Sequence, residues 1–427
     1  MSVMLSRVKR FTEGRMAKYI LADFLAVFIG FLIATYILVA LGAEQLGIYT
    51  MYSALVALFS ATAQGAANSY LMKRFFQQDA NATIGSVNIT MALFSLLSVA
   101  LYVVLFPYFG KYFYVWFFLP YALLKAFNST PYVVMRLHEE ANAFLFWSLL
   151  SKSAYIPFAL SDIVLGHFSL TRFLTLLFFN EILFFILTYG YLVVRYRYRI
   201  RIDRKYVKEN LRVSVALSPH KIFRSVYDNV DKYAVGFFIG TEALGIYSMI
   251  MRLVSPVMIY MRATNNEIAV LLSKLFSGKL EKRELLSRIR EVFALAVAVN
   301  AATILLGVGY DRFVVPLGDA FVSLFAIGLI YANGMFFYYL FYNILFLRGD
   351  KIVYFIMGIN TVVFLVWVLV FGGTIVEIAV GFVATATIGN IWMFLYLKRE
   401  DAILPLNAYW YGFLVLAAIV AGGVYIG

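Results

Sequence analysis

The sequence contains no cysteine, which excludes disulfide bonds, thiol catalysis and cysteine-based metal sites. Its three histidines, His138, His167 and His220, are isolated and show no metal-ligand spacing, so we expect no metal site. Charged residues make up only 14% of the 427 residues, whereas a soluble domain carries about a quarter. No Asp-x-Asp pair occurs either. The low charge content argues against a soluble protein, and the missing Asp-x-Asp pair argues against a glycosyltransferase.

Long apolar stretches account for most of the chain instead. The sequence is 63% hydrophobic with a mean hydropathy of +0.84. Twelve stretches between residues 17 and 397 are long enough to cross a bilayer, and residues 407–426 form a further candidate. The sequence therefore predicts an all-α polytopic membrane protein with about 12 core transmembrane helices and a candidate thirteenth at the C-terminus.

The basic residues are distributed unequally between the predicted loops. If the N-terminus is cytoplasmic, 26 of the 36 Lys and Arg residues fall on the inner side, three on the outer side and seven within spans. This bias fixes the orientation and indicates a multi-pass protein of the plasma (inner) membrane. It also explains the net charge of +13 without a nucleic-acid partner. We interpret the basic run 195–212 as a loop on the cytoplasmic side. The alternative interpretation is that this run contacts anionic lipid of the inner leaflet.

A ten-residue segment occurs twice in the chain. Residues 42–51 and 240–249 are identical at seven of ten positions, at an offset of 198. An even number of predicted spans separates the copies, so they have the same orientation, as in parallel-repeat transporters. Within the motif, we expect Gly42 and Gly240 to end helices and Glu44 and Glu242 to occupy the next first turn. The glycines at 47 and 245 are expected to permit close helix contact.

The repeat predicts two parallel lobes of six helices each. We expect an N-terminal lobe at 1–194, a basic cytoplasmic linker at 195–217, a C-terminal lobe at 218–397 and an extra helix within 398–427.

The repeated Gly-x-Glu-x-Leu-Gly-Ile-Tyr segment, after the first and the seventh span, resembles the polysaccharide transporter family of the MOP exporter superfamily. That family includes O-antigen and other lipid-linked oligosaccharide flippases. The polar stretch from Asp228 to Lys232, just before the second copy, fits the same resemblance. The resemblance implies two bundles of six helices around a central cavity, sometimes with two more helices. Thirteen candidate spans depart from that even count.

Six basic residues interrupt stretches that otherwise suit only a bilayer, and such charges usually face a water-filled space or a partner. We take these residues as candidates for binding an anionic headgroup: Lys125, Lys152, Arg224, Lys232, Arg252 and Arg262. For Lys125, Lys152 and Arg252 the prediction is strongest, because no acid lies within a turn on the same helix. Arg262, like Lys221, has the alternative of reaching the inner membrane surface.

A few acidic residues also fall within predicted spans, and the candidates for ion coupling or ion pairing are Asp23, Glu181, Asp228 and Asp231. Lys221, Arg224, Asp228 and Asp231 are spaced 3, 4 and 3 residues apart, which predicts one helical stripe. An internal ion-pair ladder that pins helices explains these charges as well as a transport role does.

A basic cavity suits a lipid whose prenyl tail carries a phosphate or pyrophosphate and a glycan. We therefore expect a non-enzymatic flippase that moves such a lipid to the outer leaflet by alternating access, with undecaprenyl and dolichyl carriers both open. No cofactor is expected beyond a Na⁺ or H⁺ coupling ion. Expected partners are the lipid-linked oligosaccharide, membrane lipids, and a glycan polymerase or glycosyltransferase; we expect a monomer.

Two other functional classes fit the sequence less well. A MATE-type exporter of organic cations, from the same superfamily, predicts a cavity dominated by carboxylates, whereas basic residues dominate here. A polysaccharide polymerase or glycosyltransferase would need an Asp-x-Asp pair, a histidine-containing site or a large outer loop, and the sequence has none of these. A scaffold or receptor leaves the intramembrane cations unexplained.

Overall fold

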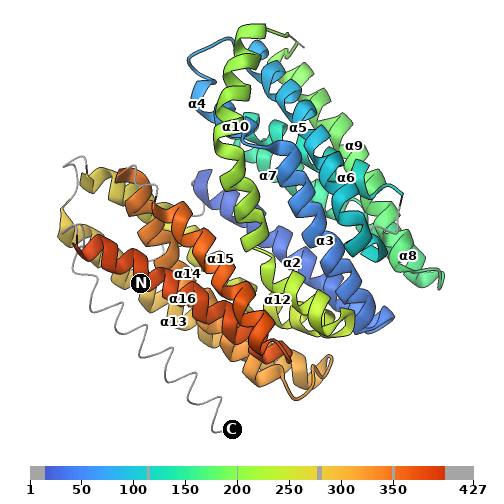
Figure 1. The fold of residues 1–427 in the computed structure, drawn as a ribbon. Helices are drawn as coiled ribbons and strands as arrows, with labels where there is room; N and C mark the ends of the chain where they lie inside the picture. Colours follow the sequence, from blue (N-terminus) through green and yellow to red (C-terminus); the bar gives the residue numbers. More distant parts are fainter. Residues whose placement is uncertain (1–14, 113–115, 200, 277–280, 349–351, 400–427) are drawn as a thin grey trace, which may run out of the picture. The chain divides into compact units, whose positions relative to one another are not determined.

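The computed structural model describes residues 15–112, 116–199, 201–276, 281–348 and 352–399. The described residues are helical nearly throughout, and the chain divides into two compact units (Figure 1). Unit 1 comprises the residues up to Ile33 and Ile48–Asn229, and unit 2 comprises Ala34–Gly47 and the residues from Val230 on. The candidate span 407–426 lies outside the described residues.

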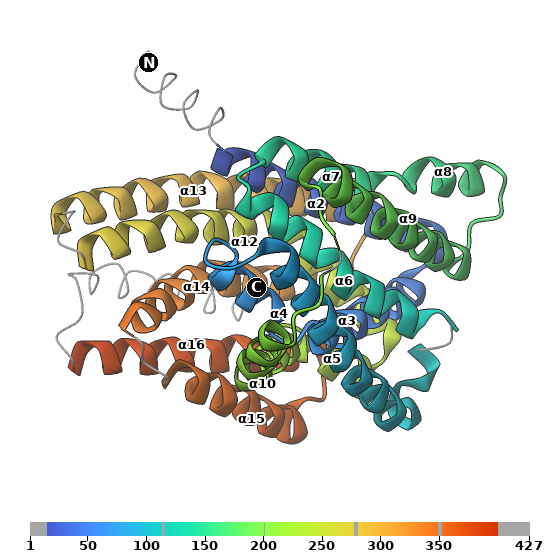
Figure 2. The same cartoon turned by 90° about the horizontal axis from the view of Figure 1, so that it is seen from above.

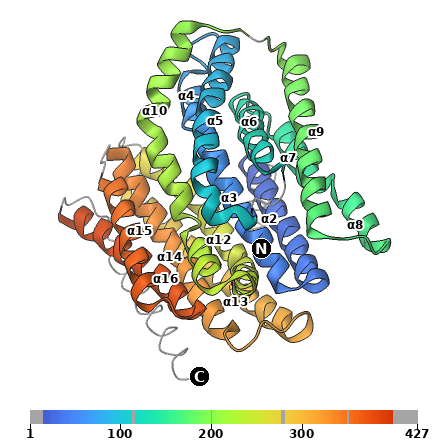
Figure 3. The ribbon, with the colours of Figure 1, turned by 45° about the vertical axis from the view of Figure 1, so that its right-hand side comes forward.

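Unit 1 begins with most of α2 (Arg15–Leu41) and most of α3 (Ala43–Gln64). It continues with α4 (Ala67–Arg74), α5 (Ala80–Phe109), the short 3₁₀ helix η1 (Gly110–Tyr112), α6 (Phe118–Leu137), α7 (Ala141–Ser153), α8 (Ile156–Val164), α9 (Leu170–Tyr196) and α10 (Arg204–Tyr227). Figure 3 shows α10 running beside α5, and α6 also packs on α5 and α9.

Unit 2 contains the end of α2, the start of α3, α11 (Val230–Ala234) and the π-helix η2 (Val235–Ile239). The long helices α12 (Thr241–Phe276), α13 (Lys282–Phe313), α14 (Phe321–Arg348), α15 (Ile352–Phe371) and α16 (Ile375–Arg399) complete it. Helix α14 packs on α12 and α16, and α15 packs on α16; Figure 2 shows these helices from above.

Eight helices among the described residues are long and apolar enough to cross a membrane, which makes the chain a multi-pass membrane protein. They are Ala43–Gln64, Ala80–Phe109, Ala141–Val164, Leu170–Tyr196, Thr241–Arg262, Arg283–Phe313, Phe321–Phe341 and Ile375–Leu397. Two shorter apolar helices, Val27–Leu41 and Gly358–Phe371, accompany them. The prediction of an all-α polytopic fold is confirmed.

Three of the spans expected from the sequence, 46–71, 142–166 and 219–240, are broken helices, and 142–166 divides into α7 and α8 at Ala154 and Tyr155. The stretch 46–71 divides into α3 and α4 at Gly65, whose φ of 49° lies in the left-handed region that favours glycine. The stretch 219–240 divides at Asp228 and Asn229, between α10 and α11. The predicted stripe from Lys221 to Asp231 is therefore interrupted, so Asp231 does not share a continuous helix with Arg224.

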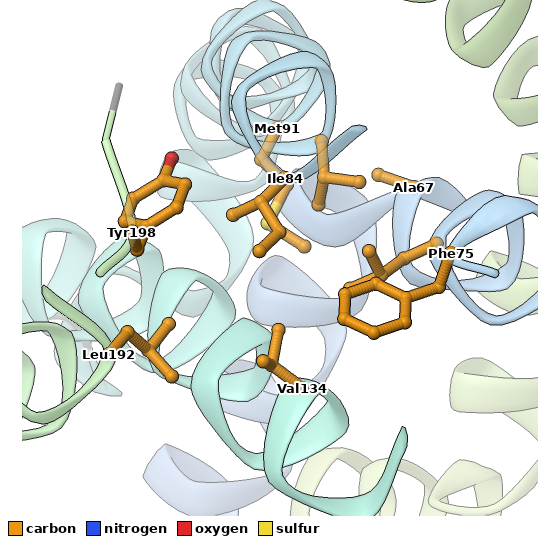
Figure 4. Packing of buried hydrophobic residues seen from close by; sticks show 9 residues of the cluster. Ala67, Phe75, Ile84, Met91, Val134, Leu192 and Tyr198 are labelled. Atoms are coloured by element: carbon orange, nitrogen blue, oxygen red, sulfur yellow. The ribbon is translucent and has the colours of Figure 1, made fainter. Parts of the chain in front are cut away.

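The apolar core of unit 1 joins α4, α5, α6 and α9. Figure 4 shows Phe75, Ile84, Val134 and Leu192 converging, with Tyr198 beside them. Because these side chains come from distant parts of the sequence, their burial holds the helices of this unit together. Tyr198 follows Arg197, which ends α9 with a left-handed φ of 52°.

The repeated motif has the same local geometry in both copies. Gly42 and Gly240 precede α3 and α12, with φ angles of 88° and 127°. Glu44 and Glu242 lie in the first turns of these helices, where a carboxylate stabilises the positive end of the helix dipole. Both expectations for the motif are therefore confirmed.

The two copies of the motif also contact each other within unit 2. A β-carbon on Gly47 would overlap the backbone carbonyl of Thr241, and one on Gly245 would overlap the carbonyl of Ala43. Each copy therefore supplies both a glycine and the carbonyl that occupies the space beside the other glycine. The expected close helix contact is confirmed, and it is reciprocal.

We predict that Gly47→Ala or Gly245→Ala destabilises the protein by about 1–3 kcal/mol, the usual cost of overpacking. Gly190→Ala is the matched control, because Gly190 lies in α9 and a β-carbon there would meet nothing within 4 Å. The control should be neutral or slightly stabilising, since alanine favours a helix more than glycine does. The midpoint of thermal unfolding in detergent measures both effects, and equal midpoints for all three variants would contradict the prediction.

A polar contact anchors α10 to α4 within unit 1. The Glu209 carboxylate accepts hydrogen bonds from Arg74 at 2.7 Å, from Gln78 at 3.2 Å and from the Tyr70 hydroxyl at 3.2 Å. Partial burial alone would raise the pKa of Glu209, but these hydrogen bonds and the Arg74 charge outweigh it and lower the pKa below its ordinary 4.5.

Because the pKa of Glu209 is lowered on folding, this anchor contributes stability above about pH 4.5 and loses it as the pH falls through the lower folded value. We predict that the wild-type protein unfolds at a higher temperature than Glu209→Gln at pH 7, and that the difference decreases as the pH falls below 4.5 and through the lower folded pKa. Thermal unfolding of both proteins across this range tests the prediction. A difference that persists unchanged at low pH would contradict it.

Candidate functional site

The structure brings two of the predicted lysines and one predicted acid together in unit 1. Lys125 lies in the middle of α6, Lys152 in the last turn of α7 and Glu181 on α9. Lys125 interacts electrostatically with both other groups, repelled by Lys152 and attracted by Glu181. We call these three residues and Asn128 the α6 cluster.

Asn128 and Glu181 connect the helices of the α6 cluster. The Asn128 side-chain nitrogen donates to the Glu181 carboxylate at 2.6 Å and to the Glu181 backbone carbonyl at 3.1 Å. The carboxylate is therefore held by an amide. Sequence reasoning missed this contact because it joins residues 53 positions apart.

The α6 cluster carries more positive than negative charge. Within the described residues, neither the half-buried Lys125 nor the exposed Lys152 forms an ion pair at 4.0 Å or less, and Lys125 has one nearby carboxylate, that of Glu181. Lys125 also lies 5.7 Å from the centre of the Tyr121 ring, a weak cation–π contact. A half-buried cation without a close counter-ion is costly, so the cluster is suited to an anionic ligand.

Arg224 and Asp228 pair with each other at the end of α10. The guanidinium lies 3.8 Å from the carboxylate, and both side chains remain about two-fifths exposed. The pair is an i, i+4 contact, which is worth a few tenths of a kcal/mol. For these two residues the ion-pair explanation is better supported than binding of a ligand.

The other predicted site residues lie in unit 2 or outside the described side chains. Lys232 and Arg252 are half-buried, and Arg262 is exposed on α12. Asp23 belongs to α2, and its side chain is not among those that the structure describes. The roles of these four residues stay predictions.

Asp231 on α11 is buried at 6% exposure and has a free oxygen. Its Oδ2 atom accepts a hydrogen bond from the buried Tyr247 hydroxyl at 2.7 Å, whereas Oδ1 is buried without a hydrogen-bond partner. The π-helix η2 follows directly, a distortion that is frequent at functional sites. Asn390 on α16, which packs against α11, likewise has a buried oxygen without a partner.

No group of three or more His, Cys, Asp or Glu side chains suited to a metal occurs among the described residues. The buried side-chain oxygens that have no hydrogen-bond partner among the described residues include those of Asp231, Asn128 and Asn390, and a proton or a monovalent cation can satisfy such acceptors.

The fold is the one seen in solved transporters of the MOP superfamily. The chain is similar to the lipid II flippase MurJ in an inward closed conformation, with a TM-score of 0.70 and 14% identity over 95% of this chain and 91% of that one. It is also similar to an inward-facing multidrug resistance MATE transporter of the MOP superfamily, with a TM-score of 0.65 and 15% identity over 88% and 95% of the two chains.

A MATE protein in a straight conformation gives a TM-score of 0.59 at 14% identity, over 92% of this chain and 99% of that one. Comparisons of the sequence with protein-family models and with curated proteins gave no match. The structural likeness therefore establishes the fold, while the substrate has to be argued from the residues of this chain.

Proposed function

We propose that this protein is a flippase that moves an anionic, prenyl-(pyro)phosphate-linked oligosaccharide from the cytoplasmic to the outer leaflet by alternating access. It acts as a transporter and not as an enzyme. The prenyl tail stays in the lipid phase while the charged headgroup passes along polar side chains.

The observation that carries this proposal is the charge of the α6 cluster. Lys125 is near Lys152 and near the Glu181 carboxylate, which Asn128 already binds, so the two lysines outnumber the one acid and positive charge is left over for a ligand. A phosphate offers several acceptor oxygens that ammonium groups bind by charge-assisted hydrogen bonds. Likeness to a lipid II flippase, a protein named for a lipid substrate, supports the same class of cargo.

Basic residues of unit 2 provide further candidate contacts for the headgroup. Arg252 is half-buried on α12, three residues after the second copy of the ten-residue motif. Lys232 and Arg262 complete this set. A guanidinium can bind a phosphate through two parallel hydrogen bonds, which makes Arg252 the first unit 2 residue to substitute.

Asp231 is the proposed coupling site for Na⁺ or H⁺. Its unpaired, buried Oδ1 atom and the unpaired Asn390 oxygen support this role, since a bound cation would satisfy acceptors that water cannot reach. Among the acids that the sequence nominates, Asp231 is the better candidate than Asp228 and Glu181, because a described basic or amide side chain already holds each of those two.

A MATE-type exporter of organic cations is the second candidate function. The fold likeness to MATE transporters favours it. It requires a site whose net charge is negative, which is the opposite of the α6 cluster. The two candidate functions therefore require ligands of opposite charge. A binding measurement that compares an organic cation with an anionic lipid distinguishes them.

The test is to deplete the protein in its native cell and identify the accumulating lipid by mass spectrometry. We expect a prenyl-linked oligosaccharide to accumulate on the cytoplasmic side, and its prenyl chain distinguishes an undecaprenyl from a dolichyl carrier. Proteoliposomes containing the purified protein should then translocate that lipid. Accumulation of no lipid, together with saturable export of organic cations, would replace the proposal with the MATE-type function.

A further inference from the structure

Lys221 on α10 lies away from any carboxylate that the structure describes. Its ammonium group donates to the side-chain oxygen of Gln64, at the end of α3. This is its one hydrogen bond among the described residues, which leaves two of the three ammonium hydrogens for a ligand. The sequence suggested that Lys221 reaches the membrane surface, but the structure ties its half-buried side chain to a polar network.

The network fixes the orientation of Gln64. Its amide nitrogen donates to the Ser129 hydroxyl, which also accepts from Asn68 at 2.8 Å and donates to the Ala126 carbonyl. Ser129 is then saturated, with two bonds accepted and one donated. The Gln64 oxygen must therefore face Lys221, so the position of the ammonium group is set by neutral side chains.

Ser129 and Lys125 lie four residues apart on the same face of α6. The helical rise separates them by about 6 Å. The Lys221 network, defined by Lys221, Gln64, Ser129 and Asn68, is therefore attached to α6 one turn beyond the α6 cluster. Two ammonium groups without an ion pair at 4.0 Å or less, Lys125 on α6 and Lys221 held beside α6 through Gln64 and Ser129, therefore lie along this helix.

We propose that Lys221 is a second anion-binding residue of this transporter, held by Gln64, and that it selects a diphosphate-linked over a monophosphate-linked prenyl headgroup. This inference rests on the proposed function. A monophosphate is satisfied by the α6 cluster alone, whereas the second phosphate of a diphosphate adds charge and acceptor oxygens for a further ammonium group.

The test measures binding of undecaprenyl diphosphate and undecaprenyl monophosphate to the full-length protein in nanodiscs by native mass spectrometry. Lys221→Met should weaken binding of the diphosphate roughly tenfold or more and change that of the monophosphate less than about twofold. Lys221→Arg should restore the preference, and Gln64→Ala should reduce it. Lys208→Met, an exposed position on the same helix, is the matched control and should bind like the wild type.

The outcomes separate this inference from the proposed function. If wild-type protein binds neither prenyl phosphate, both are overturned. If the wild type prefers the diphosphate and Lys221→Met keeps that preference, Lys221 is not a ligand-binding residue and only this inference fails. An equal loss for both lipids, with a lower unfolding midpoint that Lys221→Arg restores, assigns Lys221 a structural role and also overturns the inference.

Discussion

Substitution of Lys125 by methionine, or of Lys152 by alanine, is expected to abolish transport of the lipid-linked glycan while the protein still inserts into the membrane. Each ammonium group is expected to make a charge-assisted hydrogen bond to the headgroup, worth about 1.5–3 kcal/mol. Loss of one such bond lowers affinity roughly 10- to 150-fold. Translocation of the lipid in proteoliposomes, measured at a fixed protein density, gives the effect directly.

Arg172→Ala is the control for these substitutions. Arg172 is exposed at the start of α9 and pairs at 3.4 Å with Asp162, so its removal changes a cation outside the α6 cluster. We expect activity close to that of the wild type, because exposed pairs contribute little. Full activity in both lysine variants would show that the lysines do not bind cargo.

Removal of the Asp231 charge is the second change with a large expected effect. Asp231→Asn should eliminate the dependence of transport on a Na⁺ or pH gradient and slow it roughly tenfold or more, as expected for loss of a charged contact. The amide can still accept the hydrogen bond from Tyr247. The unfolding midpoint should therefore not fall, since burial of a neutral amide costs less than burial of a carboxylate.

Tyr247→Phe separates the coupling role of Asp231 from a purely structural one. This change leaves the buried carboxylate without its one described hydrogen bond, so we expect about 1–3 kcal/mol of destabilisation. Ion dependence should nevertheless remain. Imposed Na⁺ and pH gradients in proteoliposomes measure it, and unchanged ion dependence in Asp231→Asn would exclude Asp231 as the coupling residue.

The sequence predicts the fold class because hydrophobic length determines which segments cross a bilayer. It also predicts the geometry of the repeated motif, since Gly42 and Glu44 act within one turn of their own helix. Contacts this local depend on neighbouring residues alone, so one sequence is sufficient to infer them.

The helix breaks at Gly65 and at Asp228 and Asn229 were not predicted, for a physical reason in each case. Gly65 lies inside an apolar stretch, where membrane helices often tolerate glycine, so composition alone did not indicate a left-handed turn. At Asp228 and Asn229 the 3.6-residue spacing of charges suggested a continuous helix. Asp and Asn side chains, however, compete for backbone hydrogen bonds and favour helix ends.

The candidate site was predicted in part. The lysines on α6 and α7 stood out because charge is rare in apolar stretches, but the proximity of Lys125 to Lys152 and to Glu181 on α9 depends on packing between distant segments. The role of Gln64 was missed altogether. The sequence has only four glutamines, and one inside an apolar stretch was the available signal.

The reciprocal glycine contact of unit 2 has a consequence for how the two halves of the gene product can diverge. Each copy of the ten-residue segment is the steric boundary of the other, so a larger residue accepted in one copy would be rejected by the unchanged copy. A side-chain change in the other copy cannot relieve the overlap, because the atom that each glycine faces is a backbone carbonyl. The glycines at 47 and 245 are therefore required by backbone atoms, whereas positions 43 and 241 contribute only a carbonyl and differ in side chain, alanine in one copy and threonine in the other.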